Sequence, residues 1–211
     1  MTAATHDAAN NRTLDISGND HHFRFANGST TTSFPTKLSK KGYYFDGGDF
    51  LETTDLIDFG MDSFSYGLMV DYDRNTNSVS HTMGRYGASA VPRYGIKFTG
   101  TVSAVFLVDS NNISVNVSSD TDGRNDKQYI IISVDRVNNM AYMFMNGRLA
   151  GSANISTLTG NFSSPSGNFQ IGKISSFQIT GSIYDAFTMQ DKLNQMQAMD
   201  KYLRTLDEID R

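Results

Sequence analysis

Cysteine and tryptophan are both absent from the 211-residue sequence, and it contains only three prolines. The absence of cysteine excludes disulfide frameworks, thiol nucleophiles and cysteine-ligated zinc sites. A chain of this length does not need disulfides, because a single domain of its size buries about 70% of the surface that the unfolded chain exposes. We therefore expect one domain with an ordinary hydrophobic core.

Long apolar runs and clusters of positive charge are also missing. No segment approaches the length of a membrane span, and the start of the chain, MTAATHDAANNRT, has no apolar segment of a secretory signal. The net charge is −4, with both signs scattered along the chain, so no basic stripe is available for phosphate backbones. We expect no membrane insertion, no nucleic-acid partner and no export signal.

Glutamate is scarce, and this bears on enzymatic function. Glycoside hydrolysis needs two carboxyl groups that flank the scissile bond, but Glu52 and Glu208 are the two glutamates of the sequence and lie far apart along it. Asp71 and Asp73 share a strand face, which leaves an aspartate pair open beside the interpretation of a solvated strand end. The four histidines lie in polar contexts, and no Gly-x-Ser-x-Gly motif occurs. We predict a non-enzymatic protein, with a divergent glycoside hydrolase as an alternative.

The residues that are present favour β-strands. Short runs of β-branched and aromatic residues alternate with turns rich in Gly, Asn and Ser, and one strand places Phe64, Tyr66, Leu68 and Val70 on a single face. Asn146-Gly147 between two apolar runs predicts a type I′ hairpin, because both central residues of that turn need positive φ. The stretch YYFDGGDFLETTD predicts a second hairpin that reverses at Gly47 and Gly48 and inserts Phe45 into the core.

The periodicity changes near the C-terminus and predicts an amphipathic helix over residues 189–211. Apolar residues recur there every three or four positions, which places them on one stripe of a helix. Thr188 and Asp191 have the spacing of a capping box at its start. The stripe either packs on the chain's own sandwich or contacts a protein partner. Its members are Met189, Leu193, Met196, Met199, Leu203 and Leu206.

Five ordered segments within about residues 13–200 resemble the laminin G-like, concanavalin A-like jelly-roll family. They are LDISGNDHH, YYFDGGDFLET, DSFSYGLMVDYD, KQYIIISVDRVNNMAYMFMNGRLAGS and FQIGKISSFQITGSIYDAFTM. The resemblance implies an all-β, two-sheet antiparallel jelly-roll sandwich over residues 13–188, after a flexible segment 1–12. The chain departs from the family at Leu68 or Met69 and at Tyr129, where members commonly carry tryptophan, so the resemblance says less about the ligand.

The resemblance also implies a calcium site. Relatives often hold a structural calcium between the opening turn and an acid of the closing strand, which here nominates Asp15, Asn19 and Asp185. Calcium prefers several oxygen ligands gathered from separate loops. The alternative is an Asx-type turn at Asp15 and Asn19, with Asp185 bonded to nearby backbone.

Sugar recognition needs exposed aromatic rings beside polar side chains. The segment GRYGASAVPRYG offers Tyr86, Arg93 and Tyr94 for this role, although the same residues could cap the edge of the sandwich. We expect a lectin-like binding or packing module in a large assembly such as a virion, where it decorates a capsid or forms part of a tail or fibre. A calcium-assisted carbohydrate-binding or adhesion module on an extracellular surface is the alternative.

Overall fold

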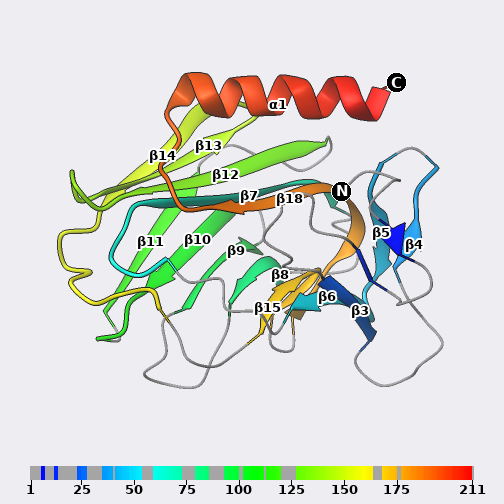
Figure 1. The fold of residues 1–211 in the computed structure, drawn as a ribbon, viewed down its shortest axis with the longest axis horizontal. Coiled ribbons are helices and arrows are strands. Elements are labelled where there is room, and N and C mark those ends of the chain that lie inside the picture. Colours follow the sequence, from blue (N-terminus) through cyan, green and yellow to red (C-terminus); the bar gives the residue numbers. More distant parts are fainter. Residues whose placement is uncertain are drawn as a thin grey trace.

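The structure is a computed structural model and describes residues 6–7, 12–13, 23–27, 35–39, 41–53, 59–72, 79–85, 93–99, 102–111, 113–119, 127–163, 168–174 and 177–210. These residues form two stacked antiparallel β-sheets, and helix α1 (Gln195–Asp210) lies across the outer face of one of them (Figure 1). The predicted all-β, two-sheet sandwich with a C-terminal helix is confirmed. No helix in the described part of the chain is long and apolar enough to cross a membrane.

The sheets interleave strands from distant parts of the chain. The nine-stranded sheet has the spatial order β1 (His6–Asp7), β2 (Arg12–Thr13), β3 (Phe23–Asn27), β6 (Asp49–Thr53), β15 (Phe169–Ile171), β8 (Val79–Arg85), β9 (Arg93–Thr99), β10 (Val102–Val108) and β11 (Ser114–Ser119). The seven-stranded sheet has the order β14 (Arg148–Asn154), β13 (Met140–Met145), β12 (Gln128–Asp135), β7 (Phe64–Tyr72), β18 (Thr180–Met189), β5 (Tyr43–Asp46) and β4 (Thr36–Lys37). A small third sheet pairs β16 (Lys173–Ile174) with β17 (Phe177–Gln178).

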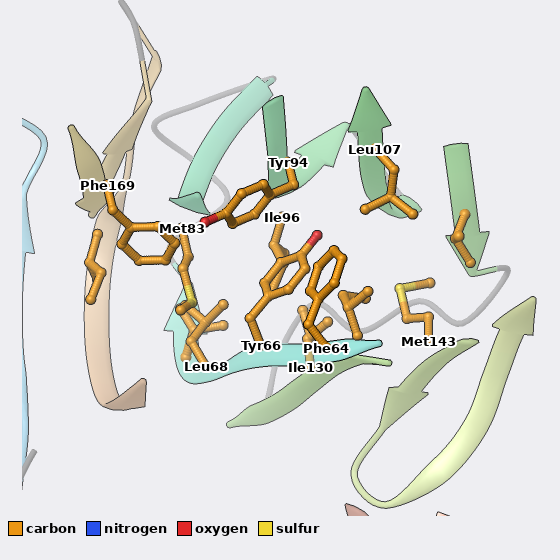
Figure 2. Packing of buried hydrophobic residues seen from close by; sticks show 14 of the residues in the cluster. Phe64, Tyr66, Leu68, Met83, Tyr94, Ile96, Leu107, Ile130, Met143 and Phe169 are labelled. Carbon is orange, nitrogen blue, oxygen red and sulfur yellow. The ribbon is translucent and has the colours of Figure 1, made fainter. Parts of the chain in front are cut away.

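The main core lies between the two large sheets. In β7 the alternation predicted from the sequence holds, because its inward side chains are fully buried against residues of the opposite sheet such as Tyr94 and Ile96 (Figure 2). Phe64 stacks on Phe59 with ring centroids 4.1 Å apart, and Phe162 meets Phe64 edge-on at 5.1 Å. Aromatic rings from several segments thus fill part of the space between the sheets.

Strand β12 is buried along its whole length, on both faces. Ile130 and Ile132 enter the main core, whereas Tyr129 and Ile131 belong to a second apolar cluster on the outer face. That face is covered by α1, as Figure 1 shows. A strand covered on both sides needs a nearly unbroken apolar sequence, which explains the run QYIIISV.

The type I′ hairpin predicted at Asn146-Gly147 is confirmed. The two residues have φ values of 50° and 75°, and the side chain of Asn146 accepts a hydrogen bond from the Tyr129 backbone N–H at 2.8 Å. A Cβ atom on Gly147 would lie 2.6 Å from the Cα of Met199 in α1. The glycine therefore serves both the turn and the close approach of the helix.

The hairpin predicted at residues 43–55 is wrong in one respect. Phe45 is fully buried as expected, and Gly47 reverses the chain with a φ of 96°. However, β5 belongs to the seven-stranded sheet and β6 to the nine-stranded one, so the turn connects the two layers. Alternation and glycines in the sequence predict a reversal, but they do not determine whether its two arms pair with each other.

The predicted start of the helix is also wrong. Thr188 and Met189 are the last residues of β18, where Thr188 pairs with Tyr66, and α1 begins six residues after Met189, at Gln195. Met189 fits the two-residue period of a strand as well as the three-to-four-residue period of a helix. The sequence pattern therefore made the predicted helix begin too early. The capping box assigned to Thr188 and Asp191 therefore does not exist.

Candidate binding groove beside helix α1

Helix α1 packs against its own sandwich. Ala198, Thr205 and Ile209 are buried on its inner face, and together with Leu193, just before the helix, Ala198 and Ile209 join the second apolar cluster. From the sheet this cluster receives Met69, Tyr129, Ile131 and Phe144. Burial of such side chains stabilises the docked helix by roughly 1.5–3 kcal/mol for each large residue.

The predicted apolar stripe is split between two environments. Leu193 is buried, Leu206 is partly buried against the cluster, and Met199 lies beside Gly147. Met196 and Leu203 instead point to solvent, with exposed fractions of 80% and 55%. The inward members explain how α1 is held, and the outward pair remains available for other contacts.

The segment that leads into α1 is fixed to the sheet by hydrogen bonds. The backbone N–H of Leu193 donates to Ser65 Oγ at 3.0 Å and to Ser133 Oγ at 2.9 Å. At the helix start, Asn194 Oδ1 accepts from the Gln197 N–H, and Gln197 Oε1 accepts from the Asn194 N–H. This reciprocal pair is a capping box, so Asn194 and Gln197 replace the pair predicted from the sequence.

A groove of about 500 Å³ lies between this segment and the outer face of β12–β14. We call it the α1 groove. Its apolar floor is formed by Tyr142, Phe144, Leu149 and Leu193, and polar groups line it from Ser133, Asp135, Asp191, Lys192, Asn194, Gln195 and Gln197. The groove thus combines an apolar surface with amide, hydroxyl and charged groups, which is the usual composition of a small-ligand site.

Tyr142 is the aromatic residue of this groove that a ligand can reach. Its ring is half-buried and stacks on Phe144 with centroids 6.3 Å apart and planes at 23°, whereas Phe144 itself is buried. An accessible ring held rigidly by a neighbour can stack on the apolar face of a ligand at low entropic cost. The exposed side chains of Gln195 and Gln197 line the same groove. Amide groups can both donate and accept hydrogen bonds, although Gln197 Oε1 already accepts one from the Asn194 N–H.

An ion pair between Lys192 and Asp135 lines the α1 groove. Lys192 Nζ lies 2.6 Å from Asp135 Oδ2, and Asn138 donates two hydrogen bonds to the same carboxylate. Burial alone would raise the pKa of Asp135, but these donors outweigh burial and hold the pKa below its usual value. Asp135 therefore stays ionised at neutral pH and fixes Lys192, which is 43% exposed, at the rim.

A second set of polar groups lies under the other half of α1. This charge cluster consists of Lys41, Tyr129, Asp185, Lys201 and Glu208. Tyr129 Oη donates to Asp185 Oδ2 at 2.6 Å, and the ammonium groups of Lys41 and Lys201 each lie 3.8 Å from Asp185. Lys41 also pairs with Glu208 of the helix. A register shift in β18 between Ile183 and Asp185, a β-bulge, turns Asp185 toward α1.

The charge cluster shifts the titration of its members. Burial would raise the pKa of Asp185, but nearby positive charges, including Lys201 and Lys41, and the Tyr129 hydroxyl hold it below its usual value. Burial, with added repulsion from Asp185, raises the pKa of Tyr129 well above its usual range. At neutral pH, Asp185 is thus a charged hydrogen-bond acceptor and Tyr129 is a neutral donor. In these states the cluster links the sheet to the helix through hydrogen bonds and ion pairs.

Of the three residues predicted to bind sugar, the structure describes the side chain of Tyr94 alone. Tyr86 lies outside the described residues, and Arg93 begins strand β9. Tyr94 is fully buried between the sheets, 5.4 Å from the ring of Tyr66 and 5.2 Å from that of Phe59. Its proposed role as an exposed sugar platform is therefore wrong, because its ring belongs to the main core (Figure 2).

The predicted calcium ligands are described only in part. Asp15 and Asn19 lie outside the described residues, and Asp73 of the alternative aspartate pair does too, whereas Asp71 is exposed on β7. An ion at Asp185 would compete with the two lysines that already face it. Among the residues that the structure describes, no group of three or more His, Cys, Asp or Glu side chains is placed to hold a metal.

Sequence reasoning missed the α1 groove because the groove depends on where the helix docks. Two signals in the sequence point towards it. The unbroken apolar run of β12 indicates a strand covered on both faces, and Asn194-x-x-Gln197 has the spacing of a capping box with amide side chains. Nothing in the local pattern around Tyr142 distinguishes it from other outward residues of a meander.

No protein-family model and no curated protein sequence matches the chain. Its fold is similar to the binding domain of botulinum neurotoxin serotype G, with a TM-score of 0.69 and 18% identity over 90% of this chain and 48% of that one. The serotype D ligand-binding domain in complex with N-acetylneuraminic acid gives a TM-score of 0.70 and 13% identity, covering 91% of this chain and 48% of that one. The serotype DC binding domain in complex with rat synaptotagmin II gives a TM-score of 0.70 and 15% identity, covering 92% of this chain and 49% of that one.

The chain therefore spans about half the length of these toxin domains. At such low identities the similarity shows a shared lectin-like jelly-roll fold and nothing more. The jelly roll predicted from the resemblance to the laminin G-like, concanavalin A-like family is confirmed at this level. Membership of that family stays a prediction.

Proposed function

We propose that this chain is a non-enzymatic, lectin-like binding module that holds a carbohydrate in the α1 groove. The accessible ring of Tyr142 beside the amides of Gln195 and Gln197 carries this proposal, because sugars present an apolar face and a rim of hydroxyl groups. A structural neighbour supports it, since the serotype D ligand-binding domain was crystallised in complex with N-acetylneuraminic acid. The serotype D and DC chains are about twice as long as this one, so their names do not indicate which half binds.

A glycan array followed by calorimetry on the retained sugar tests this function. Tyr142→Ala should weaken binding at least tenfold, which corresponds to about 1.4 kcal/mol, and Tyr142→Phe should retain most of the affinity because it keeps the ring. Tyr44→Ala is the matched control, since Tyr44 is 39% exposed on β5 of the same sheet, and it is not among the residues that line the groove. Absence of any retained glycan, or unchanged affinity in Tyr142→Ala, contradicts the proposal.

Calcium-dependent carbohydrate binding is a more specific form of the same proposed function. Asp15, Asn19 and Asp185 remain the proposed ligands, and the array is repeated with calcium and then with chelator. Sugar retention that is indifferent to chelator removes the calcium requirement and leaves the groove proposal intact.

A second candidate is a structural role in a large assembly such as a virion, as capsid decoration or as part of a tail or fibre. Met196 and Leu203 favour it, because both are apolar, lie seven residues apart on α1 and face solvent. Light scattering on the purified chain and on the double variant Met196→Lys/Leu203→Lys tests this role. A wild-type chain that stays monomeric at high concentration counts against self-assembly through α1.

A further inference from the structure

The α1 groove carries more negative than positive charge. Among its described lining residues, Asp135 and Asp191 carry carboxyl groups, and Lys192 carries an ammonium group. Its other polar lining groups are uncharged amides and hydroxyls, from Ser133, Asn194, Gln195 and Gln197. This balance bears on the kind of sugar that the groove accepts, because like charges that meet in a binding site disfavour association.

The ammonium group of Lys192 is already engaged. Its Nζ lies 2.6 Å from Asp135 Oδ2, and the Asp135 side chain is only 6% exposed. Asn138 completes the bonding of this carboxylate, because its side-chain amide donates to Oδ2 at 2.8 Å and its backbone N–H donates to Oδ1 at 3.1 Å. A ligand anion that took Lys192 for itself would leave a largely buried carboxylate without its counter-ion, which is costly.

Asp191 adds a charge that Lys192 does not neutralise. Its Oδ1 accepts a hydrogen bond from the Lys192 backbone N–H at 2.7 Å, whereas the ammonium group of the same lysine contacts Asp135. The Asp191 side chain is exposed where it lines the groove, and it makes no ion pair with any residue that the structure describes. A carboxylate in this position accepts hydrogen bonds from sugar hydroxyl groups and repels a ligand carboxylate or sulfate.

We propose that the α1 groove takes neutral glycans and disfavours acidic ones, with Asp191 and the Asp135–Lys192 pair as its specificity-determining groups. This inference rests on the carbohydrate binding proposed above and names the class of ligand. The hydroxyl groups of a neutral sugar donate to Asp191 and exchange hydrogen bonds with the amide of Gln195. An acidic sugar meets the same surfaces with added charge repulsion, and repulsion against the wrong ligand is a common source of specificity.

Calorimetry with matched pairs of sugars tests the charge selection. Each pair consists of a neutral oligosaccharide and a counterpart in which a carboxylate replaces the exocyclic hydroxymethyl group, such as oligomers of glucose and of glucuronic acid, or of galactose and of galacturonic acid. In the wild type, a neutral sugar that binds should do so roughly tenfold more tightly than its acidic counterpart at low salt. The ratio of the two affinities should shrink as the salt concentration rises, because salt screens the repulsion.

Substitutions at the two acids should reduce this ratio. Asp191→Asn removes the unneutralised charge and keeps an oxygen that accepts from Lys192, and Asp135→Asn frees the Lys192 ammonium for a ligand carboxylate. Asp191 is exposed, so its variant preserves the test even where Asp135→Asn fails to fold. Asp71→Asn is the matched control and should keep the wild-type ratio, because Asp71 is exposed near the end of β7 opposite to Ser65, which holds the groove segment.

The outcomes separate this inference from the function on which it rests. If the acidic sugar binds as tightly as the neutral one, at a site that Tyr142→Ala weakens, the charge selection is overturned and carbohydrate binding in the groove stands. An unchanged ratio in Asp191→Asn overturns the charge selection as well. If no sugar of any pair binds in a way that depends on Tyr142, the proposed function fails, and this inference fails with it.

Discussion

The space between the two sheets and the space beneath α1 are both filled by apolar side chains, but they are stabilised differently. The main core packs aromatic rings from both sheets against one another, as around Phe64 in Figure 2. Beneath α1, the apolar cluster is bordered by the charge cluster on one side and by the α1 groove on the other. We therefore expect the attachment of α1, which includes charged groups, to respond to pH and salt more strongly than the apolar packing between the sheets.

The largest expected effect is a cavity in the main core. Phe64→Ala should lower the free energy of unfolding by about 3–5 kcal/mol, because the lost ring leaves a space between fixed neighbours such as Phe59 and Phe162. Urea unfolding followed by circular dichroism measures this change. Tyr44→Ala, at an exposed site of the same sheet, should stay within about 0.5 kcal/mol. Comparable losses in the two variants would show that the inter-sheet core does not dominate stability.

A smaller loss is expected from the charge cluster. Asp185→Asn should destabilise the protein by about 2–3 kcal/mol, because it leaves Lys41 and Lys201 without their shared partner under α1. Since the folded pKa of Asp185 is lowered, its contribution is fully present above its unfolded pKa of about 4 and is lost as the pH falls through the folded value.

Measurements of the free energy of unfolding between about pH 2 and pH 7 test whether the stabilisation by Asp185 is lost as the pH falls. The wild type should lose stability below about pH 4 more steeply than Asp185→Asn, and exposed Asp62→Asn should follow the wild type. Parallel curves for the wild type and Asp185→Asn would mean that the lysines do not stabilise the carboxylate. The same comparison at high salt shows how far solvent screens this partly buried network.

The two environments of the apolar stripe allow a matched pair of substitutions. Leu193→Ala should cost about 2 kcal/mol, because Leu193 is 8% exposed and packs in the cluster beneath α1. Met196→Ala should cost less than about 0.5 kcal/mol, because Met196 is 80% exposed. Thermal unfolding of both variants measures the difference. Equal costs would contradict the docking of α1 through its inward residues.

The parts of the fold that local patterns encode could be predicted from the sequence. Alternation in β7 and the Asn146-Gly147 turn depend on a few neighbouring residues, and both were predicted correctly. The alternation of Tyr94, Ile96 and Phe98 in β9 is a local signal for the burial of Tyr94, although the surrounding Gly, Ala and Pro residues are typical of a loop. The start of α1 was misplaced because Met189 satisfies two periods at once.

Features that depend on packing between distant segments could not be predicted in this way. The α1 groove exists because residues 190–194 cross the end of β12, and the partners of Asp185 come from the helix and from Lys41. The β-bulge that turns Asp185 toward α1 leaves no clear mark in the sequence. The local pattern therefore draws attention to Asp185, but it does not indicate that Lys41 and Lys201 face this acid.

The smallest predicted effect tests whether α1 opens independently of the sandwich. Asn194→Ala removes one half of the capping box and should cost about 1 kcal/mol, while Asn194→Asp should restore most of it, because a carboxylate also accepts from the N–H of Gln197. Native-state hydrogen exchange should then speed up in α1 and stay unchanged in β7 and β12, whose amides are protected by the sheet. If exchange rises equally in the helix and in the strands, α1 unfolds together with the whole domain. The packing beneath α1 would then be as essential to the fold as the core between the two sheets.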